Sequence, residues 1–274
     1  MKKYCNAKIN LTLDMTGLRD DGYHLLRSVM HPIPLCDVLT VEKGESISLG
    51  CNIKTIPVDD RNLVCKAAKL FFEKTGIMGG MKAYLEKNTP FGAGLGGGSS
   101  DAANTLVALN EIYEYGADDE TLKEWAVQLG ADVPFFIDNK PALAEGIGEI
   151  LSPCNPLPPC QLLLVKPDFS VNTKKAYELL GDYKEAERTD ALLSALEKGD
   201  WTEISKAVGN GMQKCIAEEY PEINNICYIM KENGAYTASM SGSGSAVFGL
   251  FPTDTDLTEL KERFKNYFVF CSEM

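Results

Sequence analysis

The sequence has little of what a zinc protein, a membrane protein or a nucleic-acid-binding protein needs. Only two histidines occur, and the nine cysteines are scattered without a C-x-x-C pair, so no zinc site is expected. No apolar run approaches the roughly 18 residues of a membrane span, and the start Met-Lys-Lys-Tyr-Cys-Asn does not resemble a signal peptide. The net charge of −12 disfavours nucleic acid and anionic membranes as partners. These absences predict a reduced, cytoplasmic protein.

What remains is the composition of an ordinary globular enzyme. The 274 residues are 45% hydrophobic and 24% charged, enough for one large or two ordinary domains. The sharpest change in composition is the proline-rich stretch 152–160, because its prolines neither continue a helix nor fill a central strand. We therefore expect two domains, residues 1–152 and 153–274.

Periodicity predicts a mixture of strands and helices. Strands are expected over residues 4–15, 37–41, 46–53, 81–86, 161–166, 246–251 and 267–271. Helices are expected over residues 62–74, 100–113, 118–129, 173–180, 189–196, 201–208, 222–233 and 256–264. Because the two kinds of element follow no strict βαβ rhythm, the fold class is α+β.

The most informative stretch is a glycine-rich loop that leads into a predicted helix. Its members are Pro90, Phe91, Gly92, Ala93, Gly94, Leu95, Gly96, Gly97, Gly98, Ser99 and Ser100. Glycines let backbone amides approach a ligand closely, and a helix N-terminus presents free N–H groups and partial positive charge. The loop is therefore predicted to hold phosphate groups.

Two familiar phosphate motifs overlap this loop and are rejected. Gly92, Gly94 and Gly97 satisfy G-x-G-x-x-G, but a second helix is predicted where a dinucleotide site needs a strand. This argues against a dinucleotide-dependent oxidoreductase. The P-loop pattern fails because Gly98 stands in the place of its lysine. Positive charge must then come from a metal or from elsewhere in the chain.

The first predicted strand offers one source of that charge. Alternation places apolar Ile9, Leu11 and Leu13 on one face. The other face carries Asn6, Lys8, Asn10 and Thr12. Lys8 either extends into solvent, as strand lysines commonly do, or joins Asn10 to supply the charge that the loop lacks.

Other segments also leave a structural and a functional interpretation open. Tyr23, beside a polar turn, is either a packing lid or a binding platform, and His24 alone would be structural or solvated. Asp132, in Leu-Gly-Ala-Asp-Val-Pro-Phe, is either an N-cap for a short following turn or a catalytic base. The glycines of residues 241–245 form either a tight turn or a backbone contact to ligand or to the first domain.

Taken together, these motifs resemble the GHMP kinase superfamily. The loop at 90–100 is similar to its ATP-phosphate motif. Five further segments are similar to the branch that phosphorylates 4-diphosphocytidyl-2-C-methyl-D-erythritol, and they lie at residues 7–11, 21–25, 129–135, 144–150 and 240–244. The chain departs from that branch at Asp168 and Asn172, where glycine and serine are more usual.

The resemblance implies an ATP-binding N-terminal domain like the second domain of ribosomal protein S5, a ferredoxin-like C-terminal domain, and an active site between them. It implies that Lys8 and Asp132 are the catalytic pair. Asp132 would accept the hydroxyl proton, and Lys8 would stabilise negative charge on Asp132 and the reacting oxygens. The loop would hold ATP, and Ser100 would contact Mg²⁺.

It further implies a substrate site and a reaction, transfer of phosphate from ATP to the 2-hydroxyl of the substrate in non-mevalonate isoprenoid synthesis. The implied substrate residues are Asn10, Tyr23, His24, Thr173 and Tyr177, with the two tyrosines stacking on cytosine and His24 reading its edge. The partner is a small molecule, and the protein a monomer or weak homodimer. The alternatives are another GHMP kinase of mevalonate or homoserine type, or an inactive GHMP-like binding module.

Overall fold

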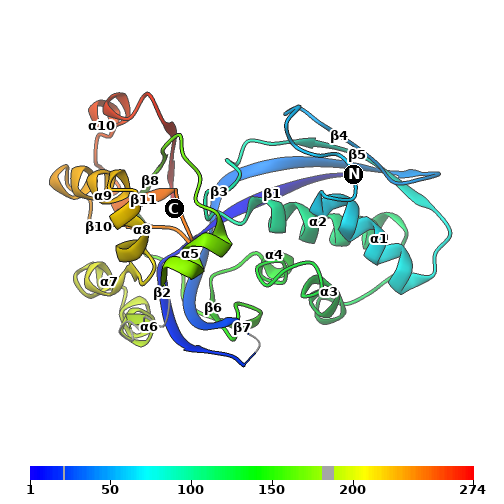
Figure 1. Cartoon of the computed structure of the whole chain (residues 1–274), viewed down its shortest axis with the longest axis horizontal. Coiled ribbons are helices and arrows are strands. Elements are labelled where there is room, and N and C mark those ends of the chain that lie inside the picture. The colour runs from blue at the N-terminus through cyan, green and yellow to red at the C-terminus, as the bar shows by residue number, and fades with distance from the viewer. Residues whose placement is uncertain (21, 181–187) are drawn as a thin grey trace. The chain divides into compact units, whose positions relative to one another are not determined.

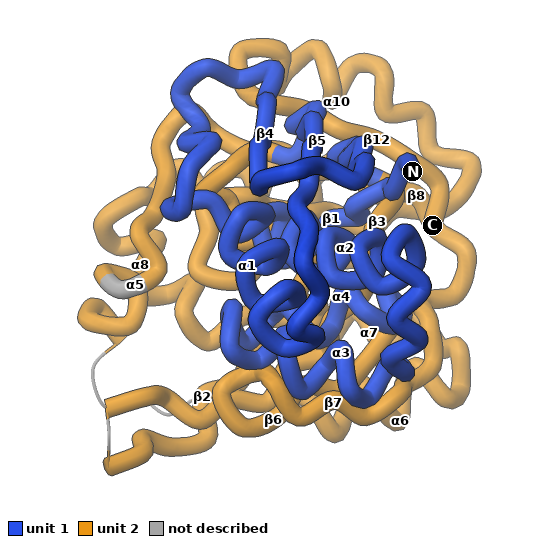
Figure 2. The backbone as a smooth tube through the Cα atoms, turned by 90° about the vertical axis from the view of Figure 1, so that its right-hand side faces the viewer, with its two compact units in different colours: residues 1–7, 35–89, 96–140 blue, residues 8–34, 90–95, 141–274 orange. Residues whose placement is uncertain are grey.

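The chain folds into two compact units, each a mixture of helices and strands (Figures 1 and 2). The computed structural model describes residues 1–20, 22–180 and 188–274. Unit 1 comprises residues 1–7, 35–89 and 96–140, and unit 2 comprises residues 8–34, 90–95 and 141–274. Two strands, β1 (Lys2–Asn10) and β3 (His24–Gly44), run through both units.

In unit 1, helices cover one face of a sheet (Figure 1). Its further elements are β4 (Ser48–Cys51), β5 (Gly80–Glu86), α1 (Leu63–Thr75), α2 (Gly97–Ile112), α3 (Asp119–Ala126) and α4 (Phe135–Asp138). Strand β5 lies between β3 and β4, antiparallel to the first and parallel to the second. Helix α1 packs on β4, β5 and α2, and α2 in turn contacts α3 and α4. The sheet and α1 thus support α2, the helix that follows the glycine-rich loop.

Local sequence signals explain where α1 begins and ends. The Asn62 side chain accepts a hydrogen bond from Val64 N at 2.9 Å and caps the N-terminus. Gly76, at φ 67°, ends the helix in left-handed geometry, and its N–H donates to Phe72 O. The helix predicted over 62–74 is therefore confirmed almost residue for residue.

Unit 2 contains the remaining elements. They are β2 (Thr12–Leu18), β6 (Ala142–Glu145), β7 (Ile150–Pro153), β8 (Gln161–Lys166), α5 (Thr173–Leu180), α6 (Arg188–Lys198), α7 (Trp201–Ala207), β9 (Gly209–Asn210), α8 (Gln213–Glu219), α9 (Glu222–Glu232), β10 (Thr237–Met240), β11 (Val247–Phe251), α10 (Thr258–Arg263) and β12 (Phe268–Glu273). Strand β2 pairs with the first part of β3 and with β9. Strand β6 pairs with β3 and β7.

The last four long strands of unit 2 form an antiparallel sheet in the order β10-β11-β8-β12. Apart from the two-residue β9, which pairs with β2, the segment runs strand, helices, two strands, helix, strand in chain order, which is the ferredoxin-like arrangement. Leu163 and Val165 of β8 share one apolar core with Ile226 of α9 and Leu260 of α10. All residues from Leu162 to Val165 are fully buried, which explains why this strand is a continuous apolar run.

The predicted α+β class agrees with this mixture of helices and strands, although several elements differ. The strand expected over 4–15 is interrupted at Leu11, and the one expected over 37–41 is the end of the 21-residue β3. Strands β6, β7, β9 and β10 and helices α4 and α8 had not been predicted. The boundary at residue 152 stays a prediction. Within the described ranges, no helix is long and apolar enough to cross a membrane.

Candidate active site

The first half of the glycine-rich loop, residues 90–95 of unit 2, is held against the glycine turn that follows β10. Gly94 has φ 75°, and a Cβ there would lie 2.0 Å from the carbonyl oxygen of Ser241. Ser241 Oγ donates to Gly94 O at 2.9 Å, and Ala246 N donates to Ala93 O at 3.1 Å. Only glycine fits this position, because both the dihedral angle and the space exclude a side chain.

The turn at residues 241–244 is held by a hydrogen bond of its own and by hydrogen bonds from the side chain of Asn210. Gly244 N donates to Ser241 O at 2.9 Å and closes the turn. The amide of Asn210, from β9, donates to Met240 O and Gly242 O, both at 2.8 Å. The segment is therefore a tight turn, and it also contacts residues 93 and 94 of the same unit. Its contact with a ligand or with the first domain stays a prediction.

The second half of the loop opens α2 in unit 1. Gly96 is the N-cap residue at φ 69° and no side chain caps the helix, so the first-turn amides have no acceptor within the helix. Ser100 is fully buried, yet its Oγ has no hydrogen-bond partner. Uncapped amides and an unsatisfied hydroxyl at a helix N-terminus are suited to a phosphate and its metal ion. The site fits the nucleotide that the sequence predicts.

Lys8 lies inside the protein and does not extend into solvent. Its side chain is 3% exposed, so the solvated alternative is wrong. Lys8 Nζ donates to Asn10 Oδ1 at 2.5 Å, and Lys8 N donates to Leu95 O at 2.9 Å. Asn10 N donates to Ser241 Oγ at 3.3 Å. The end of β1, the loop and the glycine turn are thus one hydrogen-bonded assembly within unit 2.

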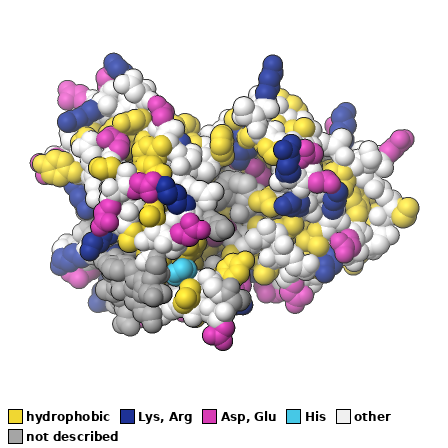
Figure 3. Space-filling model, in the orientation of Figure 1, with side chains coloured by type: hydrophobic (Ala, Val, Ile, Leu, Met, Phe, Trp, Pro, Cys, Tyr) yellow, Lys and Arg dark blue, Asp and Glu magenta, His cyan; other side chains and the backbone are white. Residues whose placement is uncertain are grey.

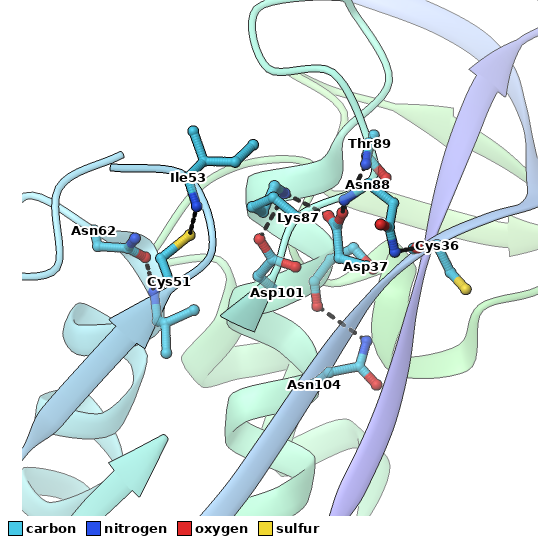
Figure 4. Close-up of polar contacts among 12 residues, drawn as sticks. Cys36, Asp37, Cys51, Ile53, Asn62, Lys87, Asn88, Thr89, Asp101 and Asn104 are labelled. Carbon is cyan, nitrogen blue, oxygen red and sulfur yellow. Dashed lines mark hydrogen bonds and ion pairs between the residues drawn. The ribbon is translucent and has the colours of Figure 1, made fainter. Parts of the chain in front are cut away.

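A buried cluster of charges next to α2 had not been predicted (Figure 4). Lys87 Nζ pairs with Asp37 Oδ2 and, at 2.8 Å, with Asp101 Oδ2. Asp37 Oδ1 also accepts from the backbone N–H of Asn88 and Thr89, at 2.6 and 2.7 Å. A Cβ on Gly97 would lie 3.2 Å from Lys87 Nζ. The cluster therefore fixes the chain segment that enters the loop and places an ammonium beside the first turn of α2.

Burial shifts the protonation equilibria in this cluster. Burial raises the pKa of Asp101 to about 7 and outweighs the attraction of Lys87. Burial disfavours the Lys87 ammonium as well, but Asp101 and Asp37 outweigh it and raise the pKa of Lys87. Cys5 has a raised pKa, first through burial and then through Asp101 and Asp37. The cluster therefore contains a carboxyl group that titrates near neutral pH.

The aromatic residues predicted to bind cytosine lie in unit 2. Tyr23 is 60% exposed, which excludes a role in core packing, while its neighbour Asp21 lies outside the described residues. The rings of His24 and Tyr177 stack at 5.0 Å and 27°. Thr173 Oγ1 lies 3.1 Å from Ser243 Oγ. The structure thus stacks two of the predicted residues on each other and brings a third into contact with the glycine turn.

One departure from the family pattern has a local explanation. Asn172 precedes α5, and its Oδ1 accepts from Lys175 N at 3.3 Å. Ala176 N donates to Asn172 O at 2.9 Å. Asparagine therefore caps α5, as the more usual serine would.

Asp132 lies in the turn before α4 and is half-buried. The N-cap position of α4 is Pro134, without a side-chain hydrogen bond. Asp132 is therefore not the N-cap residue of α4, and its interpretation as the cap of the short turn that follows it stays a prediction. Its role as a base stays a prediction.

Three structural features of the site were missed in the sequence although signals for two existed. Lys87 continues the alternation of Met81, Ala83 and Leu85, which places it on the buried face of β5. Asn210 stands between two glycines, a pattern typical of tight backbone contacts. Ser28, which binds the Asn10 side chain, had no distinguishing sequence context.

Models of known families match both halves of the chain. The model described as GHMP kinases N terminal domain matches residues 62–140, and the one described as GHMP kinases C terminal matches residues 192–269. A 4-diphosphocytidyl-2-C-methyl-D-erythritol kinase of Clostridium perfringens is 41% identical over 255 residues, 92% of this chain and 88% of its own. The chain belongs to this family of GHMP kinases.

Further relatives agree with this assignment. The corresponding kinase of Caldicellulosiruptor bescii is 39% identical over 278 residues, covering 100% of this chain and 96% of its own. A crystal structure of 4-(cytidine 5'-diphospho)-2C-methyl-D-erythritol kinase superposes with a TM-score of 0.85 at 35% identity, covering 100% and 98% of the two chains. A homoserine kinase from Cytophaga hutchinsonii, at 18% identity and a TM-score of 0.73 over 98% and 94%, shares the fold.

Proposed function

We propose that the chain transfers the γ-phosphoryl group of ATP to the 2-hydroxyl of 4-diphosphocytidyl-2-C-methyl-D-erythritol, a step of non-mevalonate isoprenoid synthesis. The observation that carries the proposal is the assembly of buried Lys8, Asn10, Ser241 and Gly94. It fixes a candidate catalytic cation to the loop that is suited to phosphate. The relatives at 39–41% identity supply the substrate class.

The loop of residues 90–100 would hold the phosphates of ATP through backbone N–H groups. Gly94, where a side chain cannot fit, and the uncapped start of α2 support this assignment. Mg²⁺ bound with the nucleotide would offset phosphate charge, and the unsatisfied Ser100 Oγ would contact it. This proposal needs no other described residue as a ligand of Mg²⁺.

Asp132 would orient the substrate hydroxyl and accept its proton, and Lys8 would stabilise charge at the reacting oxygens. Positioning and electrostatics supply most of the catalysis in phosphoryl transfer. Burial supports this role for Lys8, since a cation with few surrounding waters acts more strongly on nearby charge. Asn10, which receives the Lys8 ammonium, would share in binding the substrate.

Tyr23, His24 and Tyr177 would recognise the cytosine base, and Thr173 would contact the substrate from the start of α5. The exposed ring of Tyr23 and the His24–Tyr177 stack support this assignment, because planar bases bind to flat aromatic surfaces. His24, which stacks on Tyr177, would read the edge of the base.

The protein would work in the cytoplasm as a monomer or weak homodimer, with domains 1–152 and 153–274. All nine cysteines are free, which supports a reducing compartment. Acidic and basic side chains are interspersed on the face shown in Figure 3, and the net charge is −12. Both properties support a small-molecule partner and not nucleic acid or an anionic membrane.

Release of ADP with a panel of acceptors tests this proposal. Turnover is expected with the cytidine substrate and not with mevalonate or homoserine. Turnover with mevalonate or homoserine alone would favour the other GHMP kinases. Absence of turnover with every acceptor, despite ATP binding, would favour an inactive binding module.

A further inference from the structure

A chain of buried polar side chains continues from Lys8 away from the glycine-rich loop. Lys8 Nζ donates to Asn10 Oδ1 at 2.5 Å, and Asn10 Nδ2 donates to Ser28 Oγ at 2.8 Å. Ser28 Oγ donates to the carbonyl oxygen of Thr12 at 2.6 Å. Asn10 and Ser28 are 4% and 1% exposed, so bulk water does not replace these partners.

The direction of each hydrogen bond follows from counting protons. A carbonyl oxygen can only accept, so the single proton of the Ser28 hydroxyl is used by Thr12 O. Ser28 Oγ can then only accept from Asn10, which must present its NH₂ group to Ser28. The other end of the amide, Oδ1, must therefore face Lys8. A reversed amide would place NH₂ hydrogens against the Lys8 ammonium and leave Ser28 without a donor.

A second serine, Ser241, accepts a hydrogen bond from the backbone of Asn10, as Ser28 does from its side chain. Ser241 Oγ donates to Gly94 O at 2.9 Å and so accepts from Asn10 N. Gly242 lies next to this amide, since a Cβ built on it would be 3.4 Å from Asn10 Oδ1. Asn10 is thus fixed at its backbone by one serine and at its side chain by the other.

From this geometry we propose that Ser28 is a positioning residue of the phosphoryl-transfer reaction. It sets the orientation of the Asn10 amide, and this orientation presents the oxygen that holds the Lys8 ammonium in place. Ser28 touches neither nucleotide nor substrate in this proposal. The proposal rests on the proposed function of Lys8.

The test is Ser28→Ala, compared with Ser239→Ala as a matched control. Ser239, on β10, is 2% exposed and donates to Gln213 Oε1 at 3.2 Å, so the control also removes a buried hydroxyl and one hydrogen bond. Leaving the Asn10 amide without an acceptor is expected to lower kcat by about ten- to a hundredfold. The Kd for ATP should stay within about threefold of the parent, and the control should keep its kcat.

Two further readouts separate positioning from a general loss of structure. Ser28→Thr keeps the hydroxyl and should restore most of kcat. In an Asn10→Ala background, Ser28→Ala should have little additional effect, because the residue through which it acts is gone. The proposal would be overturned if the double variant lost kcat by the product of the two single-variant factors. It would also be overturned if the kcat of Ser28→Ala stayed within about threefold of the parent.

The side-chain amide of Asn10 provides a readout that does not depend on the substrate. Its ¹⁵N–¹H₂ signals should be protected from hydrogen exchange in the parent and in Ser28→Thr, and should lose protection in Ser28→Ala. Lost protection with unchanged kcat would overturn the positioning role while leaving the proposed function intact. If Ser28→Ala does not fold, Ser28→Cys replaces it, because a thiol is a weaker donor and acceptor than a hydroxyl. The kcat of Ser28→Cys should then lie between the values of the parent and of Asn10→Ala. A kcat equal to that of the parent would overturn the proposal.

Discussion

Replacing Gly94 by alanine adds a single methyl group, and this group is expected to disrupt the phosphate loop. Alanine in left-handed geometry costs about 1 kcal/mol or slightly more. The new Cβ would lie 2.0 Å from Ser241 O, and relieving such overpacking typically costs about 1–3 kcal/mol. Because Ser241 also binds Gly94 O and Asn10 N, the displacement would spread to Lys8. We expect a loss of about 2–4 kcal/mol in the free energy of unfolding and at least about tenfold weaker ATP binding.

Gly116→Ala is the matched control, because Gly116 has φ 81° with nothing within 4 Å of a Cβ. It carries the same backbone strain without the clash, so it should cost about 1 kcal/mol and keep parental ATP affinity. Urea unfolding measures the stability of each variant, and titration calorimetry measures ATP binding. A Gly94→Ala protein that binds ATP as tightly as the control would refute the reasoning.

Three other substitutions test separate parts of the site. Asp132→Asn removes the proposed proton acceptor and should lower kcat by about 10²–10⁴ with ATP affinity retained; a rate within about threefold of the parent would exclude the role. Tyr23→Ala removes a stacking surface worth about 1–3 kcal/mol, so KM for the cytidine substrate should rise about ten- to a hundredfold while KM for ATP does not. Equal damage to both constants would contradict the role of Tyr23 as a surface for cytosine. The pKa of Asp101 is raised to about 7 from its ordinary 3.8. Between these two values the folded state binds a proton that the unfolded state has lost. The contribution of this proton to the free energy of unfolding therefore declines as pH rises from about 4 through 7. Asp101→Asn cannot ionise, and its stability relative to the parent should therefore improve between about pH 5 and pH 8 in urea unfolding; a difference independent of pH would contradict the assignment.

The elements that could be predicted are those whose signals are local. The glycine-rich loop and α2 were evident because Gly94 and Gly96 adopt positive φ, which the sequence encodes residue by residue. Helix α1 was bounded by an Asn cap and a terminal glycine. Strand β8 was marked by four consecutive apolar residues that are all buried.

The elements that could not be predicted depend on partners far away in the sequence. Polar residues and prolines interrupt the apolar residues of β3, and it is one long strand because β2, β6 and β5 pair with successive parts of it. The alternation that Lys87 continues from β5 indicates a buried side chain, but its partner Asp37, fifty positions earlier, is evident only in the structure. The role of Ser28 is evident only from its hydrogen bond with the side chain of Asn10 in the structure. Tertiary contact, and not local propensity, determines each of these.

The position of the transferred phosphate tests the central claim most directly. The parent enzyme is incubated with ATP, Mg²⁺ and 4-diphosphocytidyl-2-C-methyl-D-erythritol, and the product is analysed by ³¹P NMR with carbon coupling and by mass spectrometry. The account predicts one new phosphate monoester on the 2-hydroxyl, formed in equal amount to ADP, with the cytidine diphosphate intact. A phosphate on another hydroxyl, or ADP and free phosphate without a new ester, would contradict it.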